Sequence, residues 1–182
     1  MELPTLETDR LLLAALTPDE APRVAELAGE KAVARNTESS IPHPYTEEQA
    51  EAFLRELGER IDDGEAAVFG IFGIDLADEE ALIGAVGLHP EPDHERARLG
   101  YWIGRPYWGR GYATEAARAA VDWAFGAFDL QRVYAESFRR NRASCRVLEK
   151  LGMEREGRLR RHFKKWGEFV DLEIYGLLRD ER

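Results

Sequence analysis

The sequence is poor in cysteine and has no long hydrophobic run. A single cysteine, Cys145, excludes an internal disulfide and a cysteine-rich metal site, and we expect no bound metal. The longest apolar runs, residues 11–16 and 66–74, are far shorter than the ~20 apolar residues of a membrane-spanning helix. The acidic first residues lack the basic and then apolar pattern of a secretory signal. These absences predict a cytoplasmic protein with no membrane partner.

The chain also lacks internal repeats and a recognisable linker. Its 182 residues are enough for one well-buried domain and few for two. The apolar and charged fractions, 44% and 33%, are those of a globular protein. We therefore predict that residues 1–182 form a single domain.

Positive charge is scarce in the first half of the chain. Residues 1–95 hold 6 Lys+Arg against 23 Asp+Glu, a formal charge of −17, whereas residues 96–182 hold 19 against 12, or +7. A basic C-terminal half suits a polyanionic cofactor, and an acidic N-terminal half suits a cationic acceptor, although solvation and internal ion pairing explain the asymmetry equally well. The net charge of −10 and the lack of a binding motif argue against nucleic acid.

Residues 107–116 hold the most informative motif, a glycine-punctuated turn between a predicted strand and a predicted helix. Gly109 and Gly111 permit backbone conformations that other residues rarely adopt, so that successive N–H groups can point at one anion. The helix that follows adds its unpaired N–H groups and the positive end of its dipole. The loop lacks the third glycine of a dinucleotide site and the Gly-Lys-Ser/Thr of an ATP site. A pyrophosphate is the anion that it suits best.

Apolar periodicity and turn residues predict an α+β order with one mixed sheet. Capping boxes at Thr17 and Thr46 start the first two helices. Two strands are expected to pair around the acidic turn 75–80, and residues 89–95 to form the next turn. The predicted order is strand 10–16, helix 17–29, helix 46–64, strands 67–74 and 81–88, a strand ending at 104, helix 112–128, strand 132–137, helix 141–151, and two strands that meet across residues 164–167.

Motifs on both sides of the loop match those of a known family. They are Gly100-Tyr101-Trp102-Ile103-Gly104, Pro106-Tyr107-Trp108 with the loop itself, Asn141-Arg142-Ala143-Ser144, Leu151-Gly152-Met153, Gly157-Arg158, and the set Gly167, Asp171 and Tyr175. Together with the order of elements, they resemble the GNAT acetyltransferases of the RimJ/RimL type, which acetylate the N-termini of ribosomal proteins. The resemblance spans nearly the whole chain and is strongest from Gly84 onward. It implies the GNAT fold, a single mixed, mostly antiparallel sheet of about seven strands flanked by helices.

The resemblance implies that acetyl-CoA is the co-substrate. In the family the glycine loop holds the pyrophosphate through backbone N–H groups, the strand before it splays away from the next strand and pairs with the pantetheine arm, and one N–H there steadies the developing oxyanion. Arg110 would add charge, although an exposed loop arginine is often only solvated. Asn141 would contact the arm or cap its own helix. The residues implied to bind acetyl-CoA are Tyr101, Trp102, Ile103, Trp108, Gly109, Arg110, Gly111, Tyr112, Ala113, Thr114 and Asn141.

Acetyl transfer also requires a proton donor for the leaving thiolate. RimJ/RimL-type enzymes are similar to this chain in placing a serine at the position of Ser144, whereas many other GNAT enzymes use a tyrosine at the position of Leu148. The resemblance therefore implies Ser144 as the catalytic acid. The competing interpretation is a helix-start serine bonded to its own backbone.

The sequence does not identify a general base. Many relatives carry a glutamate on the strand before the Gly-Tyr-Trp motif, where this chain has Arg98. Glu95, His89, His43 and Glu65 are candidates through a bridging water, each with an ordinary structural role as the alternative. An α-amine with a pKa of about 7.7–8.0 needs less help than a lysine at about 10.4. The missing base therefore favours an N-terminal amine.

We predict direct transfer of an acetyl group from acetyl-CoA to a primary amine in a ternary complex, with a protein or peptide N-terminus as the first choice. His43 and Tyr45 lie in a loop that resembles the acceptor-binding segment of the family and are the candidate substrate-binding residues. A small amine, such as an antibiotic or a polyamine, and a catalytically silent acyl-CoA-binding module remain alternatives. A homodimer is compatible with the sequence.

Overall fold

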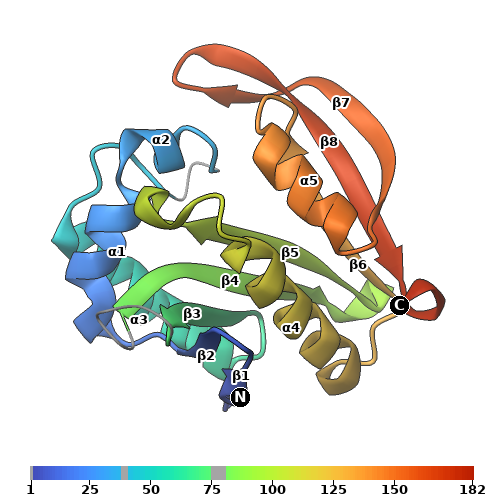
Figure 1. The fold of residues 1–182 in the computed structure, drawn as a ribbon, viewed down its shortest axis with the longest axis horizontal. Coiled ribbons are helices and arrows are strands. Elements are labelled where there is room, and N and C mark those ends of the chain that lie inside the picture. The colour runs from blue at the N-terminus through green and yellow to red at the C-terminus, as the bar shows by residue number, and fades with distance from the viewer. Residues whose placement is uncertain (1, 38–40, 75–80) are drawn as a thin grey trace.

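One sheet of eight strands runs through the molecule in the computed structural model, which describes residues 2–37, 41–74 and 81–182 (Figure 1). Its spatial order is β1-β2-β3-β4-β5-β6-β8-β7, with β5 and β6 parallel and the other neighbours antiparallel. This confirms the predicted single mixed sheet, with one strand more than expected because β1 has too few residues to show alternation. The strands are β1 (Leu6–Glu7), β2 (Leu11–Ala15), β3 (Ala67–Gly73), β4 (Ala81–Glu91), β5 (Arg96–Ile103), β6 (Arg132–Phe138), β7 (Glu154–Lys165) and β8 (Glu168–Leu178).

The helices begin where the capping signals predicted. Thr46 Oγ1 accepts a hydrogen bond from Gln49 N at 3.3 Å, and the Gln49 side chain accepts one from Thr46 N at 3.0 Å. The box at Thr17 starts a short 3-10 turn, Pro18–Glu20, before the first helix. A four-residue helix after Gly29 was not predicted, since it is too short for a periodic pattern. The helices are α1 (Ala21–Ala28), α2 (Lys31–Ala34), α3 (Glu47–Asp62), α4 (Tyr112–Ala127) and α5 (Arg142–Lys150).

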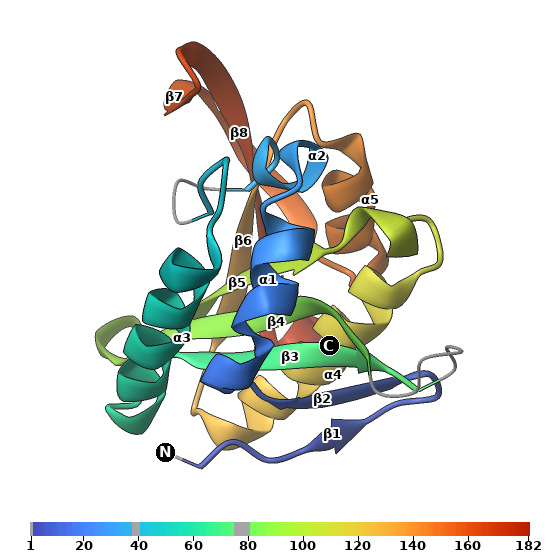
Figure 2. The same ribbon diagram turned by 90° about the vertical axis from the view of Figure 1, so that its left-hand side faces the viewer.

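Helices cover both faces of the sheet (Figure 2). On one face α1 and α3 pack together and bury Val24, Leu54 and Leu57 against the sheet. On the other face α4 packs on β2, β4 and β5, with α5 beside it against β6 and β7. Alanines recur at helical spacing on the buried side of α4 and let it lie close to the strands. The sheet therefore separates two cores.

The second turn expected around residues 89–95 is shorter than predicted. Residues 89–91 continue β4 and pair with residues 96–98 of β5, so that the turn is limited to Pro92–His94 and Glu95, whose φ is 48°. Pro90 marked this segment as a turn in the sequence. β3 pairs with β4 only as far as Leu88, so Pro90 lies where β4 has lost one neighbour and an N–H is not needed on that side.

The last two strands form a long hairpin whose far end extends beyond the helical layers (Figure 2). β8 pairs with β6, and β7 forms the edge of the sheet. The hairpin bends at two register shifts, between Arg155 and Gly157 and between Leu159 and Phe163. The predicted pairing of strands 67–74 and 81–88 is confirmed by β3 and β4, while the acidic turn 75–80 lies outside the described residues. Within the described ranges, no helix is long and apolar enough to cross a membrane.

Candidate active site

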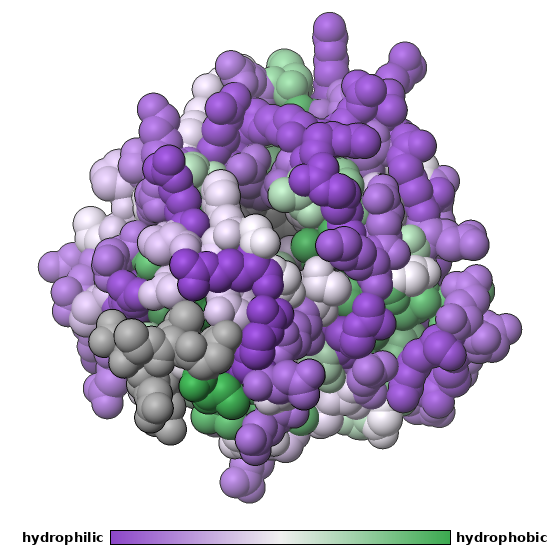
Figure 3. Space-filling view, viewed as in Figure 1, coloured by the Kyte–Doolittle hydropathy of each residue, from purple (hydrophilic) through white to green (hydrophobic). Residues whose placement is uncertain are grey.

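β5 and β6 part midway along their length and form a fork. They pair only through residues 96–99 and 132–135. Beyond this point β5 stays paired with β4 through Ile103, and β6 stays paired with β8 through Phe138. A groove of about 770 Å³ follows the fork, with walls from α3, α4, α5 and both strands. Figure 3 shows the surface hollowed near the middle of the same view as Figure 1, with hydrophilic side chains around the opening.

The glycine loop lies at one end of this groove. Gly109 and Gly111 have φ angles of 78° and 87°, which non-glycine residues rarely adopt. Gly111 is the N-cap of the 16-residue helix α4 and has no side chain to bond the first-turn N–H groups. Trp108 holds the loop against the fork, since its Nε1 donates a hydrogen bond to Ile103 O at 2.6 Å. Backbone donors and the helix dipole thus face a groove that can hold an anion.

The loop is supported from behind by Thr8 and Arg10, which lie in the turn between β1 and β2. Arg10 donates from Nη1 to Arg110 O at 3.0 Å, and its Nη2 lies 2.6 Å from Glu115 Oε2 on the first turn of α4. Glu115 also accepts hydrogen bonds from Thr8 Oγ1 at 2.7 Å and from Arg10 N at 3.0 Å. The Arg10 guanidinium lies 4.8 Å from the centre of the Tyr112 ring. These contacts fix both sides of the glycine turn to the β1–β2 turn, which the glycine motif does not include.

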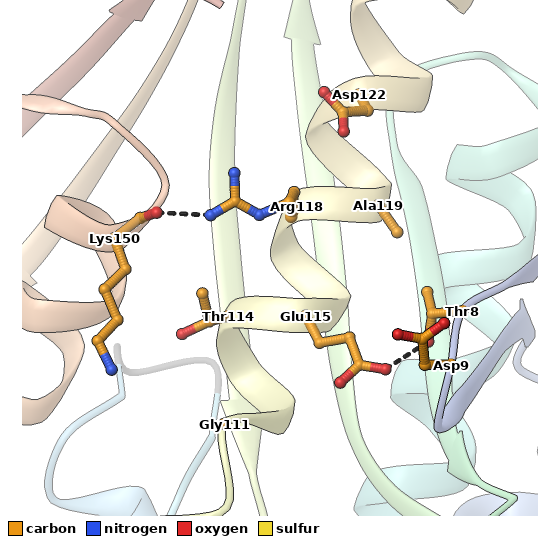
Figure 4. A pocket seen from close by; sticks show the side chains of 9 residues that line it. All are labelled: Thr8, Asp9, Gly111, Thr114, Glu115, Arg118, Ala119, Asp122 and Lys150. Carbon is orange, nitrogen blue, oxygen red and sulfur yellow. Dashed lines mark hydrogen bonds between the residues drawn. The ribbon is translucent and has the colours of Figure 1, made fainter.

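A second hollow, of about 580 Å³, borders α4 (Figure 4). Lys150 and Thr114 lie on one side of the helix in this view, and Glu115 with Thr8 lies on the other. Arg118 Nη2 donates to Lys150 O at 2.6 Å, which ties α4 to the end of α5. Lys150 and Thr114 line the groove as well, so that the two hollows meet beside the glycine loop.

Two hydroxyl groups meet at the side of the fork. Tyr101 OH lies 2.9 Å from Ser144 Oγ and also donates to Ser144 O at 3.2 Å. Burial raises the pKa of Tyr101 well above its usual range, so it is a neutral phenol. Asn141 caps α5, and its Oδ1 accepts a hydrogen bond from Ser144 N at 3.2 Å. The helix start therefore fixes the serine backbone, while the tyrosine orients its side chain.

Cations and a histidine line the α3 side of the groove. His89 and Arg98 are opposite each other on β4 and β5, and Arg60 Nη2 lies 3.4 Å from His89 Nδ1. Burial, together with the charges of Arg98 and Arg60, lowers the pKa of His89 to about 4. His89 is therefore neutral at physiological pH. Tyr45 also lines this side, where burial raises its pKa to about 12.

The structure brings most of the sequence-predicted site residues to one groove and leaves two outside it. Arg110 is not among the lining residues, and its carbonyl bonds to Arg10. His43 is also not among them: its Nδ1 is 2.8 Å from Gly29 O, and its ring lies 5.8 Å from that of Trp166. The predicted residues that line the groove are Tyr45, Tyr101, Trp102, Ile103, Trp108, Gly109, Gly111, Tyr112, Ala113, Thr114, Asn141 and Ser144.

Sequence reasoning missed several polar residues of the groove, among them Arg60 and Glu136. Arg60 is one of several charges on an exposed helix, and no pattern marks it. Glu136 lies on the half-buried side of β6, and this is a detectable signal, because an acidic residue in an inner strand usually has a specific reason. Of the base candidates, His89 lines the groove, whereas Glu95 caps a turn and Glu65 lies 3.9 Å from Arg60 as an exposed side chain.

Known proteins share this arrangement. The acetyltransferase (GNAT) domain family matches residues 10–154. The N-acetyltransferase YoaA of Bacillus subtilis is 32% identical over 178 residues, which cover 97% of each chain. The putative ribosomal N-acetyltransferase YdaF of the same organism is 33% identical over 102 residues, 56% of each chain. The structure of RimL, a ribosomal L7/L12 α-N-protein acetyltransferase in complex with coenzyme A, superimposes with a TM-score of 0.85 over 98% of this chain and 100% of that one, at 17% identity.

The family match covers the central strands, the fork, the glycine loop and α5, which are the parts that build the groove. The full-length relative extends the similarity to both ends of the chain. The chain therefore belongs to the GNAT family and is an acetyl-CoA-dependent N-acetyltransferase.

Proposed function

We propose that this enzyme acetylates the α-amino group of a protein or peptide N-terminus. The observation that carries the proposal is the fork of β5 and β6, which has the glycine loop at one end and the Ser144 hydroxyl at its side. Acetyl-CoA lying in the fork would present its thioester close to Ser144. An amine would then approach from the α3 side, where Tyr45 lines the groove. Both substrates would be bound at once, and the acetyl group would pass directly between them.

The cofactor end is supported by the loop geometry. Backbone N–H groups around Gly109 and Gly111 would hold the pyrophosphate, and the edge of β5 that lacks a strand neighbour would pair with the pantetheine arm. The same edge would supply an N–H to the carbonyl oxygen as it gains negative charge. Asn141 would reach the arm while it caps α5.

Ser144 would protonate the leaving sulfur. Attack of the amine nitrogen on the thioester carbonyl carbon breaks the C–S bond, and the CoA thiolate that leaves takes the proton of the serine hydroxyl. The phenol has one proton, which Ser144 O accepts in the structure. When that proton turns to Ser144 Oγ instead, the serine proton is free to go to the sulfur and the developing alkoxide is stabilised. Tyr101 would thus act through Ser144 as a positioning residue.

Two observations favour an N-terminal amine. His89, the candidate base in the groove, is a weak base because its pKa lies at about 4. An α-amine is partly neutral at pH 7, whereas lysine and polyamine nitrogens are almost fully protonated. Among relatives, the match to a protein named as a putative ribosomal N-acetyltransferase agrees with this choice.

The test is mass spectrometry of products from a mixed panel of peptides with free N-termini, N-blocked lysine peptides, spermidine and an aminoglycoside. We expect acetyl-CoA-dependent mass gain on free N-termini and thiol release at the same rate. Acetylation confined to spermidine or the aminoglycoside would replace the proposed acceptor with a small amine. Acetyl-CoA binding without product on any amine would instead support a silent acyl-CoA-binding module.

A further inference from the structure

Glu136 lies at the branch point of the fork. It is the first residue of β6 after the pairing with β5 ends at Ala135, and its half-buried side chain lines the groove. Side chains of a strand alternate between faces. Val133 and Ala135 belong to the core beneath α4, so Glu136 projects toward the α3 face. This is the face from which the amine would approach.

The space beside Glu136 is open. On β5, the residue after the last pair with β6 is Gly100, and a Cβ placed on it would meet no atom within 4 Å. Gly100 pairs with Gly87 on β4, which also lines the groove. Because neither of these paired glycines has a side chain, the groove is open at the branch point. An acceptor amine and the thioester carbonyl would meet there.

The Glu136 carboxylate has no hydrogen bond or ion pair with any residue that the structure describes. Two other acidic side chains of the inner strands are paired: Glu91 accepts from Tyr134 at 2.6 Å, and Glu173 lies 2.5 Å from Arg155. Among the described residues that line the groove, Glu136 is also the single Asp or Glu. A half-buried carboxylate without a partner is costly unless a ligand or water satisfies it.

The other titratable groups near the α3 side do not suit an ammonium ion. Arg60 and Arg98 are cations and would repel it. His89 is neutral and already engages Arg60 through Nδ1. Tyr45 is a neutral phenol, and His162 lines the groove as an exposed side chain. The Glu136 carboxylate can both bind an ammonium ion and accept its proton. A carboxylate is a weak base, which suits an α-amine better than a lysine.

We propose that Glu136 is the general base of the reaction and the residue that holds the acceptor amine. The assignment rests on the proposed amine acetylation. The acceptor ammonium ion binds the Glu136 carboxylate and transfers one proton to it, directly or through one water. The nitrogen lone pair then attacks the thioester carbonyl, the C–S bond breaks, and Ser144 protonates the thiolate. The proton on Glu136 leaves to solvent before the next turnover.

The test is Glu136→Gln, which keeps size and removes charge. We expect kcat/KM for the acceptor to fall about 100-fold at pH 7, within the range that a positioned base contributes, while the dissociation constant of acetyl-CoA stays within twofold. The deficit should shrink toward pH 9, where free neutral amine becomes abundant. Glu56→Gln removes an exposed carboxylate of α3 that does not line the groove and is the matched control, with activity unchanged.

The outcomes separate the two proposals. Full activity of Glu136→Gln on an amine that the wild type acetylates overturns the role of Glu136 and leaves amine acetylation standing. If Glu136→Gln lowers kcat/KM by the same factor at every pH from 6 to 9, Glu136 is not the general base and has a packing role instead. If the wild type acetylates no amine in the panel, the proposed function fails and the Glu136 assignment fails with it.

Discussion

Ser144 takes part in three contacts at the first turn of α5, and each limits what its hydroxyl can do. Its N–H is held by Asn141, its carbonyl accepts from Tyr101, and its Oγ is 2.9 Å from the same phenol. With its backbone and Oγ held in this way, the serine can still rotate its hydroxyl hydrogen toward different acceptors. The resemblance to RimJ/RimL enzymes predicted the serine, but the tyrosine partner depends on β5 and α5 lying side by side, which no local pattern reveals.

Substitutions at this pair test the acid step. We expect Ser144→Ala to lower kcat about 100-fold with little change in the dissociation constant of acetyl-CoA, because the acid acts on the leaving group and not on the bound ground state. Tyr101→Phe should cost about tenfold, and the double variant should be no worse than Ser144→Ala, since the tyrosine acts through the serine. Steady-state kinetics of the three variants measure this, and additive losses would contradict a shared role.

His89 gives the molecule a pH-dependent stability. Its pKa is about 4 in the folded protein and near 6.5 when exposed, so the unfolded chain binds the extra proton first as the pH falls. Stability is thus lost between pH 6.5 and 4, by up to about 3 kcal/mol. Urea unfolding of His89→Asn should show a flatter decrease over this window than the wild type. His94→Asn changes an exposed histidine, and a flattening there of the same size would remove His89 as the cause.

At the scale of elements, the glycine loop depends on the turn between β1 and β2, which holds Arg10 against it. The motif in residues 107–116 predicts the turn, the positive φ angles and the helix start, since these depend on local residue types. It does not predict Arg10, which lies a hundred residues earlier and reaches Arg110 and Glu115 because β2 lies beneath α4. Residues 89–91 also show why a local pattern is not enough. Pro90 is tolerated in β4 because the pairing with β3 stops at Leu88, and the sequence around Pro90 does not reveal where that pairing stops.

Removing the Arg10 side chain should make the glycine loop more mobile, while the backbone N–H groups that would bind the pyrophosphate remain in place. We expect Arg10→Ala to raise the dissociation constant of acetyl-CoA about tenfold, or ~1.4 kcal/mol, through the lost bonds to Arg110 and Glu115. Isothermal calorimetry gives this value. Arg55→Ala breaks an exposed ion pair with Glu51 on α3 and is the control, with no expected change. An Arg10→Ala enzyme that binds acetyl-CoA as tightly as the wild type would show that the loop needs no support.

At the scale of the whole molecule, the sheet consists of two parts joined by a short parallel pairing. The order of elements and the family resemblance predicted one mixed sheet and the splayed strand, and both are confirmed. The depth of the groove, which residues of α3, β4 and β6 line together, depends on packing between segments far apart in sequence. Such packing is set by the whole core, so the acceptor side is the part that sequence alone describes least.

Because the fork joins the two parts through only residues 96–99 and 132–135, a ligand in it should hold them together. At one hundred times its dissociation constant, acetyl-CoA should add about 2.7 kcal/mol to the free energy of unfolding and raise the Tm by about 5–10 °C. Pantetheine or adenosine bisphosphate alone spans part of the fork and should raise it less. Hydrogen exchange should slow at residues 100–103 and 136–138, whose strands part there. A Tm rise without added protection in these two segments would mean that acetyl-CoA binds elsewhere.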